Sequence, residues 1–309
     1  MSICRLLVNF IVIGLTTIFV SACNQASPVA TIQPSLVVTT EIAGVSPEPS
    51  RTPVPPTSTP IPLAAVVNGE PITLAEFQAE LNRFQASVTI TGTNLASDAE
   101  TIVLTELIDQ ILLAQSAAEN DFNVDDTMLQ SRIEALETGL GSKQALDEWK
   151  DTHGYSDEDF QQALRRSIGA AWMRDQIIAA VPETMDQVHV IQILLYSAAE
   201  ADELYKTLQS GADFRELAAE YDPVTGGDLG WFPRGYLREP AIDEAVFALQ
   251  LEQYSQVVET EIGFHILYLM EKDPNHVLLP DARMTLQEKA LQDWISEHRN
   301  QSDIQILLP

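Results

Sequence analysis

The sequence contains only two cysteines among its 309 residues, Cys4 and Cys23, and both lie near the N-terminus. Residues 1–22 are predicted to be a signal peptide, which would remove Cys4 from the mature protein. Cys23 is expected to carry lipid, for the reason given below. The rest of the chain then has no thiol for a disulfide, a cysteine nucleophile or a cysteine metal site. Cysteine-dependent enzymes are therefore excluded.

Basic residues are also scarce. The chain has 17 Lys and Arg against 45 Asp and Glu, a formal net charge of −28. Such a surface repels nucleic acid and anionic lipid head groups, so neither is expected as a partner. Its simplest role is to keep a secreted protein soluble. Hydrophobic residues still make up 45% of the chain, enough to bury real cores, and the length suggests two domains.

The N-terminus carries an apolar run, Leu6 to Val20, after a single Arg5. The run is shorter than the roughly 20 residues of a membrane span and is typical of a secretory signal. The following Val-Ser-Ala-Cys23 resembles the bacterial lipobox, whose cysteine is lipidated and becomes the first mature residue. We expect an extracytoplasmic protein anchored by lipid to the bacterial cell membrane. A plain signal anchor that happens to contain a cysteine is the alternative.

The next two segments differ sharply in composition. Residues 23–63 are rich in Pro, Ser and Thr, as in SPEPSRTPVPPTSTPIP, and are predicted to form an extended tether. Residues 64–183 are predicted to be helical after a small hairpin, AAVVNGEPIT, with its turn at Asn68-Gly69. Thr73 and Glu76 form a capping box for the first helix. Apolar periodicity predicts four more helices, at 99–119, around 129–140, around 146–154, and from 156 to Pro182.

The pattern changes after Pro182. VHVIQILLYS predicts a strand, followed by two amphipathic helices at 201–208 and 214–221 and then a glycine-rich loop. A short helix at 243–249, a strand near 257–260 and a last strand, GFHILYLME, complete a compact unit. The tail, 284–309, is predicted to be a helix and a strand that cannot fold alone and dock on the helical domain. The fold class is therefore α+β.

The glycine-rich segment GGDLGWF (226–232) does not suit a phosphate-binding loop. Such a loop follows a strand and leads into a helix that begins with a lysine or serine. Here the glycines follow a helix, and the residues after them cannot begin one. No lysine occurs between Lys206 and Lys272. The glycines must serve another purpose.

Four segments, in this order and spacing, resemble a parvulin-type (PpiC) peptidyl-prolyl isomerase domain: GADFRELAAEYDP, GGDLGWFPRG, DEAVFAL and GFHIL. They place that domain at 186–273. The flanking segments VNGEPITLAEF, ALDEWKDTHGYSDEDFQQALRR and LQDWISEHR resemble the discontinuous chaperone domain of the SurA and PrsA foldases. Residues 64–183 and 274–309 would form the chaperone domain, with the isomerase domain inserted. A lipobox ahead of this pair is most similar to the PrsA arrangement.

The resemblance implies a set of catalytic residues. His265 matches the family's second pocket histidine, Thr260 matches the threonine bonded to the histidine pair, and Asp222 lies closest to the acidic or cysteine group near the twisted bond. Gln192 replaces the family's first histidine, and the stretch before the glycines is shorter than usual. Glutamine still donates and accepts hydrogen bonds, so we expect weakened rather than lost catalysis, with little pH dependence near neutrality.

The resemblance also implies an apolar niche for the proline ring. Leu237 and Phe247 match apolar positions and Ile242 lies near the family's proline-contacting aromatic, while Trp231 and Phe232 belong to the glycine-rich turn that walls the niche. Leu237, Ile242 and Phe247 could equally be plain core residues. The chemistry implied needs no metal and no cofactor. The acidic segment YSAAEADELYK stands where phosphate-directed relatives carry basic residues, so no phosphate preference is expected.

Two principal functions remain open. The first is a foldase that catalyses cis–trans exchange at X–Pro bonds of unfolded or partly folded exported proteins. The second is a chaperone whose parvulin domain only binds peptides, with Gln192 as the mark of lost catalysis. A purely structural lipoprotein is a third alternative. The sequence leaves open the identity of the clients and whether the helical part forms a homodimer.

Overall fold

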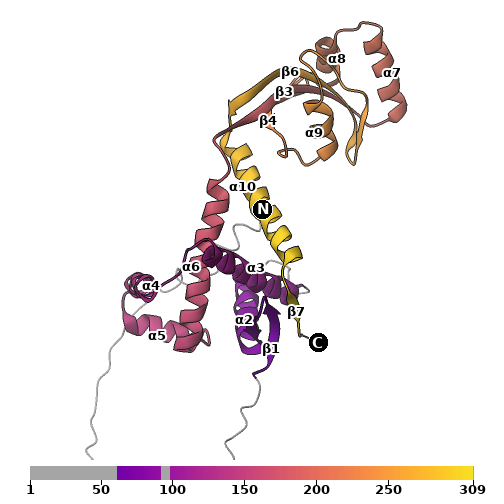
Figure 1. Cartoon of the computed structure of the whole chain (residues 1–309). Coiled ribbons are helices and arrows are strands. Elements are labelled where there is room, and N and C mark those ends of the chain that lie inside the picture. The colour runs from indigo at the N-terminus through magenta and orange to yellow at the C-terminus, as the bar shows by residue number, and fades with distance from the viewer. Residues whose placement is uncertain (1–60, 92–97, 309) are drawn as a thin grey trace, which may run out of the picture.

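The computed structural model describes residues 61–91 and 98–308. The predicted signal peptide, Cys23 and nearly all of the predicted tether lie outside the described residues. The molecule is elongated, with helices and a small sheet at one end and a larger sheet at the other (Figure 1). Helices α6 (Asp157–Ala179) and α10 (Pro280–Gln301) connect the two ends and pack against each other. The predicted α+β class is confirmed.

The small sheet unites the two ends of the described chain. Strands β1 (Leu63–Val67) and β2 (Glu70–Thr73) form the predicted hairpin. Asn68 and Gly69 have φ values of 50° and 86°, the left-handed conformation that a two-residue hairpin turn needs. Strand β7 (Ile304–Ile306) adds to the other edge of β1, giving the order β2-β1-β7. The tail therefore pairs with the first hairpin.

The predicted helices of this part are all present. They are α2 (Leu74–Thr91), α3 (Ala99–Glu119), α4 (Asp126–Leu140), α5 (Lys143–Thr152), α6 (Asp157–Ala179) and α10 (Pro280–Gln301). Thr73 caps α2, because its hydroxyl accepts a hydrogen bond from the Glu76 N–H at 3.0 Å. Among the described helices α3 alone is long and apolar enough to span a membrane. Half of its apolar window is buried against the rest of the protein, which is typical of a core helix.

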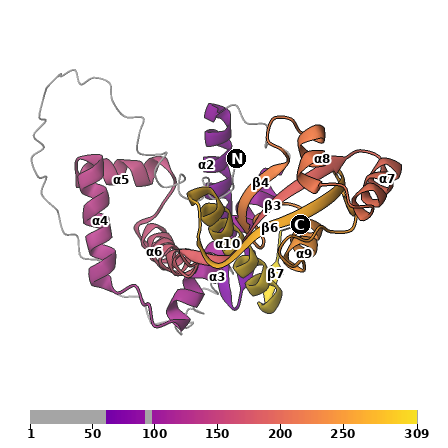
Figure 2. The same ribbon diagram turned by 90° about the horizontal axis from the view of Figure 1, so that it is seen from above.

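Two arginines connect segments that are far apart in sequence. Arg166 of α6 donates to Glu70 at 2.6 Å and to Glu76 at 2.5 Å, and it is only 5% exposed. Arg299 of α10 donates through two nitrogens to Asp109 of α3. These contacts hold the hairpin, the long helix and the C-terminal helix together. Seen from above, α4 and α5 stand away from this centre on the side opposite the larger sheet (Figure 2).

The larger sheet has four antiparallel strands in the order β4-β3-β6-β5. Their bounds are β3 (Thr184–Leu195), β4 (Asp228–Pro233), β5 (Val258–Thr260) and β6 (Gly263–Val277). Helices α7 (Ala198–Gln209) and α8 (Phe214–Tyr221) pack on one face, and α9 (Pro240–Phe247) packs on the other. Strands β3 and β6 are longer than predicted because their outer ends pair with each other towards the helical part.

Strand β4 was missed by the sequence analysis, which predicted a loop there. The segment contains Gly230 and ends in Pro233, and both residue types weaken a strand prediction. The structure tolerates them because β4 lies at the edge of the sheet, where a proline leaves no ladder hydrogen bond unmade on the inner side. GGDLGWF is therefore a turn leading into an edge strand.

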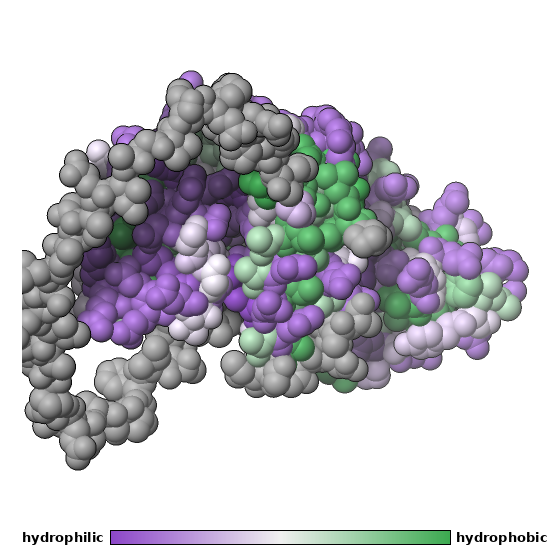
Figure 3. Space-filling model, turned by 90° about the horizontal axis from the view of Figure 1, so that it is seen from below, coloured by the Kyte–Doolittle hydropathy of each residue, from purple (hydrophilic) through white to green (hydrophobic). Residues whose placement is uncertain are grey.

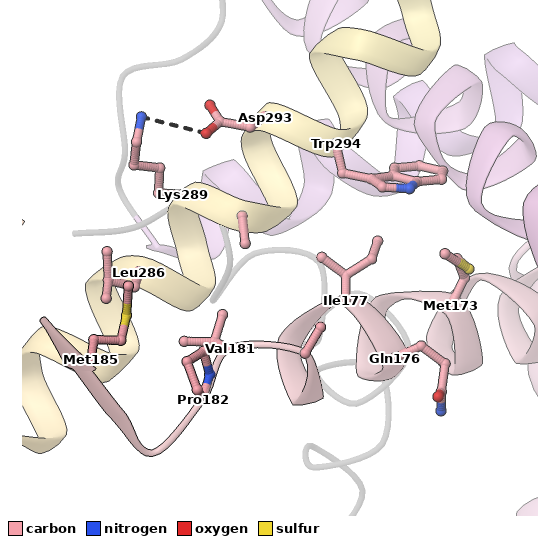
Figure 4. Close-up of a pocket in the computed structure, with 12 residues that line it drawn as sticks. Met173, Gln176, Ile177, Val181, Pro182, Met185, Leu286, Lys289, Asp293 and Trp294 are labelled. Atoms are coloured by element: carbon pink, nitrogen blue, oxygen red, sulfur yellow. Dashed lines mark ion pairs between the residues drawn. The ribbon is translucent and has the colours of Figure 1, made fainter. Parts of the chain in front are cut away.

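The surface of the helical part has an apolar region and a hydrophilic region. Seen from below, apolar residues gather over the centre of the molecule, whereas the side where α4 and α5 lie is mainly hydrophilic (Figure 3). A separate apolar groove of about 550 Å³ runs between α6 and α10 (Figure 4). Its lining includes Met173, Ile177, Val181, Met185, Leu286 and Trp294. The groove lies where the helical part meets the larger sheet.

Candidate functional site

Three of the predicted catalytic residues meet on one face of the larger sheet. The Nδ1 atom of His265 lies 2.9 Å from the Gln192 Oε1 atom, and its Nε2 atom lies 2.9 Å from the Thr260 Oγ1 atom. The contact is possible because Gln192 is on β3, His265 on β6 and Thr260 on β5, which are consecutive in the sheet. Sequence reasoning identified the trio, and the strand order brings it together.

The hydrogen bonds define the state of the imidazole. With the Gln192 carbonyl oxygen facing Nδ1, that nitrogen carries the proton, and Nε2 is the acceptor that faces the Thr260 hydroxyl, which also donates to the Gly263 carbonyl oxygen at 3.2 Å. His265 is only 1% exposed, and burial lowers the pKa of its imidazole below the usual range. The ring is therefore neutral at neutral pH. It lies beneath the half-buried Gln192 and Thr260 and holds both side chains in position.

The predicted proline-binding residues share this face. Leu237, Ile242, Phe247 and Phe232 belong to one apolar cluster under α9. Val258 joins the cluster and is also paired directly with His265 in the sheet, so the cluster borders the hydrogen-bonded trio. Ile242 and Phe232 are buried, whereas Leu237 and Phe247 are half-buried. The accessible floor therefore consists of the second pair, and the first pair supports it.

Trp231 is not with the other predicted substrate-binding residues. Neighbouring residues of a strand point to opposite faces, and Phe232 occupies the α9 face. The Trp231 ring instead stacks on His276 with a centroid distance of 4.1 Å and lies near His189. Trp231 was predicted to bind substrate because GGDLGWF was interpreted as a loop. In a loop, neighbouring side chains are not assigned to opposite faces. As strand residues, only one of the two aromatic rings can reach the site.

The glycines of GGDLGWF allow the backbone to approach β3 closely. The Gln192 N–H donates to the Gly227 carbonyl oxygen at 2.8 Å. A Cβ atom at position 227 would lie 2.0 Å from the Gln192 carbonyl oxygen, so only glycine fits. Gly227 also has a φ of 74°, in the left-handed region. The glycine-rich turn therefore fixes the backbone of a site residue.

Asp222 lies on the same turn but does not contact His265. Its carboxylate accepts hydrogen bonds from the Thr225 hydroxyl and from the N–H groups of Val224 and Thr225. The Thr225 hydroxyl and these N–H groups hold the pKa of Asp222 below its usual range. The Asp222 carbonyl oxygen also accepts from the Gly226 N–H. Asp222 thus organises the turn that docks on Gln192.

Asp243 was not among the predicted site residues. It is 6% exposed on α9, and its Oδ2 atom accepts a hydrogen bond from the Gly235 N–H at 2.5 Å. Burial raises the pKa of this carboxyl group. The contact holds the loop that carries Leu237. The sequence signal that could have identified it is an acidic residue on the apolar side of a short helix. Residues 61–91 and 98–308 contain no cluster of three or more His, Cys, Asp or Glu arranged to hold a metal.

Two family models match the chain. The model described as a SurA-like N-terminal domain matches residues 3–174, and the one described as a PPIC-type PPIase domain matches residues 196–271. The second match contains Asp222, Thr260 and His265, whereas Gln192 lies just before it. The first match spans more than half of the chain. The chain therefore belongs to the family with a SurA-like N-terminal domain, and a parvulin-type isomerase domain follows that domain.

Individual proteins are also similar to this chain. Foldase protein PrsA of Halalkalibacterium halodurans is 25% identical over 264 residues, which cover 72% of this chain and 77% of the relative. Chaperone SurA of Methylobacillus flagellatus is 32% identical over 148 residues, covering 41% and 34%. Among solved structures, peptidylprolyl isomerase PrsA of Bacillus anthracis matches with a TM-score of 0.40 and 24% identity, covering 64% of this chain and 96% of that one.

Proposed function

We propose that this chain is an extracytoplasmic foldase that catalyses cis–trans isomerisation of X–Pro bonds in unfolded client proteins. The observation that carries the proposal is the hydrogen-bonded trio of Gln192, His265 and Thr260 beside an apolar floor. Relatives named foldase, chaperone and parvulin-like isomerase support it. No covalent step is required, because the reaction is rotation about a partial double bond.

The floor lowers the barrier by disfavouring the planar imide. Amide resonance resists rotation by about 18–20 kcal/mol and separates charge between oxygen and nitrogen. An apolar surface at Leu237 and Phe247 stabilises that charge poorly, whereas the twisted state is less polar. Binding energy that is larger for the twisted state than for the planar state accelerates exchange.

Gln192 supplies the hydrogen bond that recognises the twisted state. Its Oε1 atom is engaged by His265, and its Nε2 atom has no hydrogen-bond partner among the described residues. Twisting leaves a lone pair on the imide nitrogen, which can accept a hydrogen bond from that free amide group. His265 and Thr260 then act as positioning residues. A hydrogen bond of this kind contributes about 0.5–1.5 kcal/mol, so catalysis is modest.

The groove between α6 and α10 suits the chaperone half of the function. Ile177 and Met173 face Trp294 and Leu286 across it (Figure 4). The walls are apolar, and Lys289 and Asp293 pair with each other at the rim. An apolar segment of an unfolded client can lie there without desolvating an unpaired charge. The groove ends next to the isomerase sheet, so both parts can hold one client.

An isomerisation assay on the full chain tests the catalytic proposal. We expect a measurable rate enhancement on a proline tetrapeptide and a fall of about tenfold in kcat/KM for His265→Ala or Gln192→Ala. His276→Ala is the matched control, because that imidazole stacks on Trp231 on the other face. A flat trace, with client aggregation still suppressed, would instead establish the binding-only chaperone.

We further propose that Cys23 carries the lipid that holds the protein at the cell membrane. The support is the lipobox-like Val-Ser-Ala-Cys23 after the apolar run. Metabolic labelling with a radioactive fatty acid should label the chain and fail to label Cys23→Ser, which should leave the membrane fraction. Equal labelling of the variant would contradict the assignment.

A further inference from the structure

Tyr236 connects the two parts of the molecule. It lies in the loop between β4 and α9, and its half-buried side chain packs against two separate apolar clusters. One is the cluster under α9 that contains the floor residues Leu237 and Phe247. The other, which we call the junction cluster, has Val181, Leu278 and Ala282 as its buried residues, with Met185, Leu286 and Ala290 packed against them. Among the described residues, Tyr236 alone belongs both to a core cluster of the larger sheet and to the junction cluster.

The junction cluster is also part of the wall of the groove between α6 and α10. Four of its residues line that groove: Val181, Met185, Leu286 and Ala290. Leu286 of α10 and Met185 of β3 lie close to each other at one end of it (Figure 4). An apolar segment in the groove therefore contacts the same side chains that pack with Tyr236.

A second contact between α10 and the isomerase loop lies beside the first. The Lys289 side chain runs along Gly235, because a Cβ atom at position 235 would lie 3.6 Å from the Lys289 Cε atom. From the other side, the Asp243 carboxylate of α9 accepts a hydrogen bond from the Gly235 N–H at 2.5 Å. The loop is thus held between α9 and α10, and the floor residue Leu237 is only two residues further along the chain. The position of the floor therefore depends on α10.

We propose that Tyr236 couples the groove to the isomerase site, so that an apolar segment bound in the groove raises the rate of proline isomerisation. This rests on the proposed function and names how that site is regulated. An occupant gives the half-buried Met185 and Leu286 new contacts. Close-packed side chains transmit such changes, so the Tyr236 ring and the floor beside it are held in one position. A floor that is already in position speeds the reaction.

The groove can be filled covalently, because the sequence contains no cysteine after Cys23. In a full chain with Cys4→Ser and Cys23→Ser, Ala180→Cys places a single thiol at an exposed position that lines the groove. Reaction with N-phenylmaleimide then puts an aromatic ring there. Ala179→Cys, labelled in the same way, is the matched control, since Ala179 is adjacent and exposed but does not line the groove.

The readout is kcat/KM on a proline tetrapeptide, which is too short to reach both the groove and the site. We expect the label on Ala180→Cys to raise kcat/KM about fivefold over the same variant without label. The label on Ala179→Cys should leave the rate unchanged. Tyr236→Ala should abolish the increase and Tyr236→Phe should retain it, because the ring makes the contacts. A rate that the label leaves unchanged or lowers, or an increase that survives Tyr236→Ala, would overturn the proposal.

Lys289→Ala gives the same test if Tyr236→Ala does not fold. Lys289 is exposed, and its replacement removes the side chain that runs along Gly235. We expect the increase caused by the label to fall to about twofold, and Lys289→Met, which keeps a long side chain, to retain it. An increase that is equally large in all three chains would overturn the proposal.

A failure of the proposed function gives a different result. If neither the wild type nor any variant isomerises the peptide, its affinity is measured by NMR shift perturbation on labelled and unlabelled Ala180→Cys. Tighter binding in the labelled chain that Tyr236→Ala abolishes would support the coupling in a binding-only module. Equal affinities would reject it.

Discussion

The helical part and the sheet part of this protein are held together in different ways. The helical part is built from two segments of the chain, one before and one after the sheet part. Arg299 of the second segment pairs with Asp109 of the first, and the buried Arg166 pairs with Glu70 and Glu76 within the first segment. The sheet part is continuous in sequence. Its central contacts are strand pairing, an apolar cluster on each face and one chain of neutral hydrogen bonds.

The difference shows what each part must achieve. A discontinuous unit has to select the correct partner among distant segments, and a bidentate arginine does so with defined geometry. A prolyl isomerase site needs a surface that stabilises charge poorly, and a buried ion beside it would oppose that. The buried arginine, Arg166, lies in the helical part, whereas the buried carboxyl group near the site, Asp243, has its pKa raised by burial, which favours its neutral form. Each prediction below separates the two parts further.

The largest expected effect is on the stability of the helical part. Arg166→Ala leaves Glu70 and Glu76 without their cation in a site where the arginine is 5% exposed. Breaking such a buried pair costs about 3–5 kcal/mol. Thermal unfolding followed by circular dichroism should show a separate, earlier transition for the helical part.

Arg165→Ala is the control for this comparison. It is adjacent in sequence, but its partner Asp126 is 95% exposed. We expect its unfolding free energy to change by no more than about 0.5 kcal/mol. Equal destabilisation by both variants would show that the buried ion pairs do not distinguish the two parts.

The next effect concerns the sheet part. Gly227→Ala brings a Cβ atom to 2.0 Å from the Gln192 carbonyl oxygen and must displace the turn or the strand. We expect a loss of about 3 kcal/mol in unfolding free energy and of up to about 100-fold in kcat/KM, because the site residue moves. Isomerase kinetics and urea unfolding on the same samples measure both.

Gly226→Ala isolates the contribution of backbone conformation. Gly226 has a φ of 66°, close to that of Gly227, but nothing lies within 4 Å of its Cβ position. We expect a loss of about 1–2 kcal/mol in unfolding free energy and little change in activity. If Gly226→Ala abolished activity as well, close approach to Gln192 would not be the reason for the glycine.

A smaller effect is the pH dependence of stability, which we expect in the helical part through Glu106. Burial, together with Asp109 and Glu80, raises the pKa of Glu106 from 4.5 to about 7. The folded chain then holds this proton more tightly than the unfolded chain, so stability falls as pH rises from 4.5 to about 7. Glu106→Gln should remove that loss and gain about 1–2 kcal/mol at pH 8, after allowance for its partial exposure.

Unfolding midpoints at pH 5 and pH 8 test this, with Glu119→Gln, exposed at the end of α3, as the control. The gain should appear only at the higher pH and only in the transition of the helical part. A gain of the same size at pH 5 would mean that the substitution acts by packing or helix propensity instead.

The smallest effect is on the neutral hydrogen-bond chain. Thr260→Val removes the hydroxyl that contacts His265, and we expect kcat/KM to fall about three- to tenfold. Thr207→Val, whose hydroxyl bonds within α7, should leave the rate unchanged. Because burial lowers the pKa of His265, wild-type activity should be level above about pH 6.5. A steep rise through neutral pH would contradict a neutral imidazole.

Much of the site was accessible from the sequence because its residues lie in local motifs. GFHIL located His265, and the hairpin, the caps and the apolar periodicities located the main elements. The sequence could not separate Trp231 from Phe232, because that requires knowing that the segment is a strand. It also could not reveal that Asp222 binds its own turn or that Asp243 holds the Leu237 loop, since both depend on contacts formed after folding.

By itself the sequence determined the order and type of nearly all the elements, because helix and strand periodicity and turn chemistry are local properties. Tertiary structure decided what those elements face. It put His265 out of solvent, brought the glycine turn against Gln192 and joined the C-terminal strand to the first one. Such outcomes depend on strand order and close packing between distant segments, which no local pattern encodes.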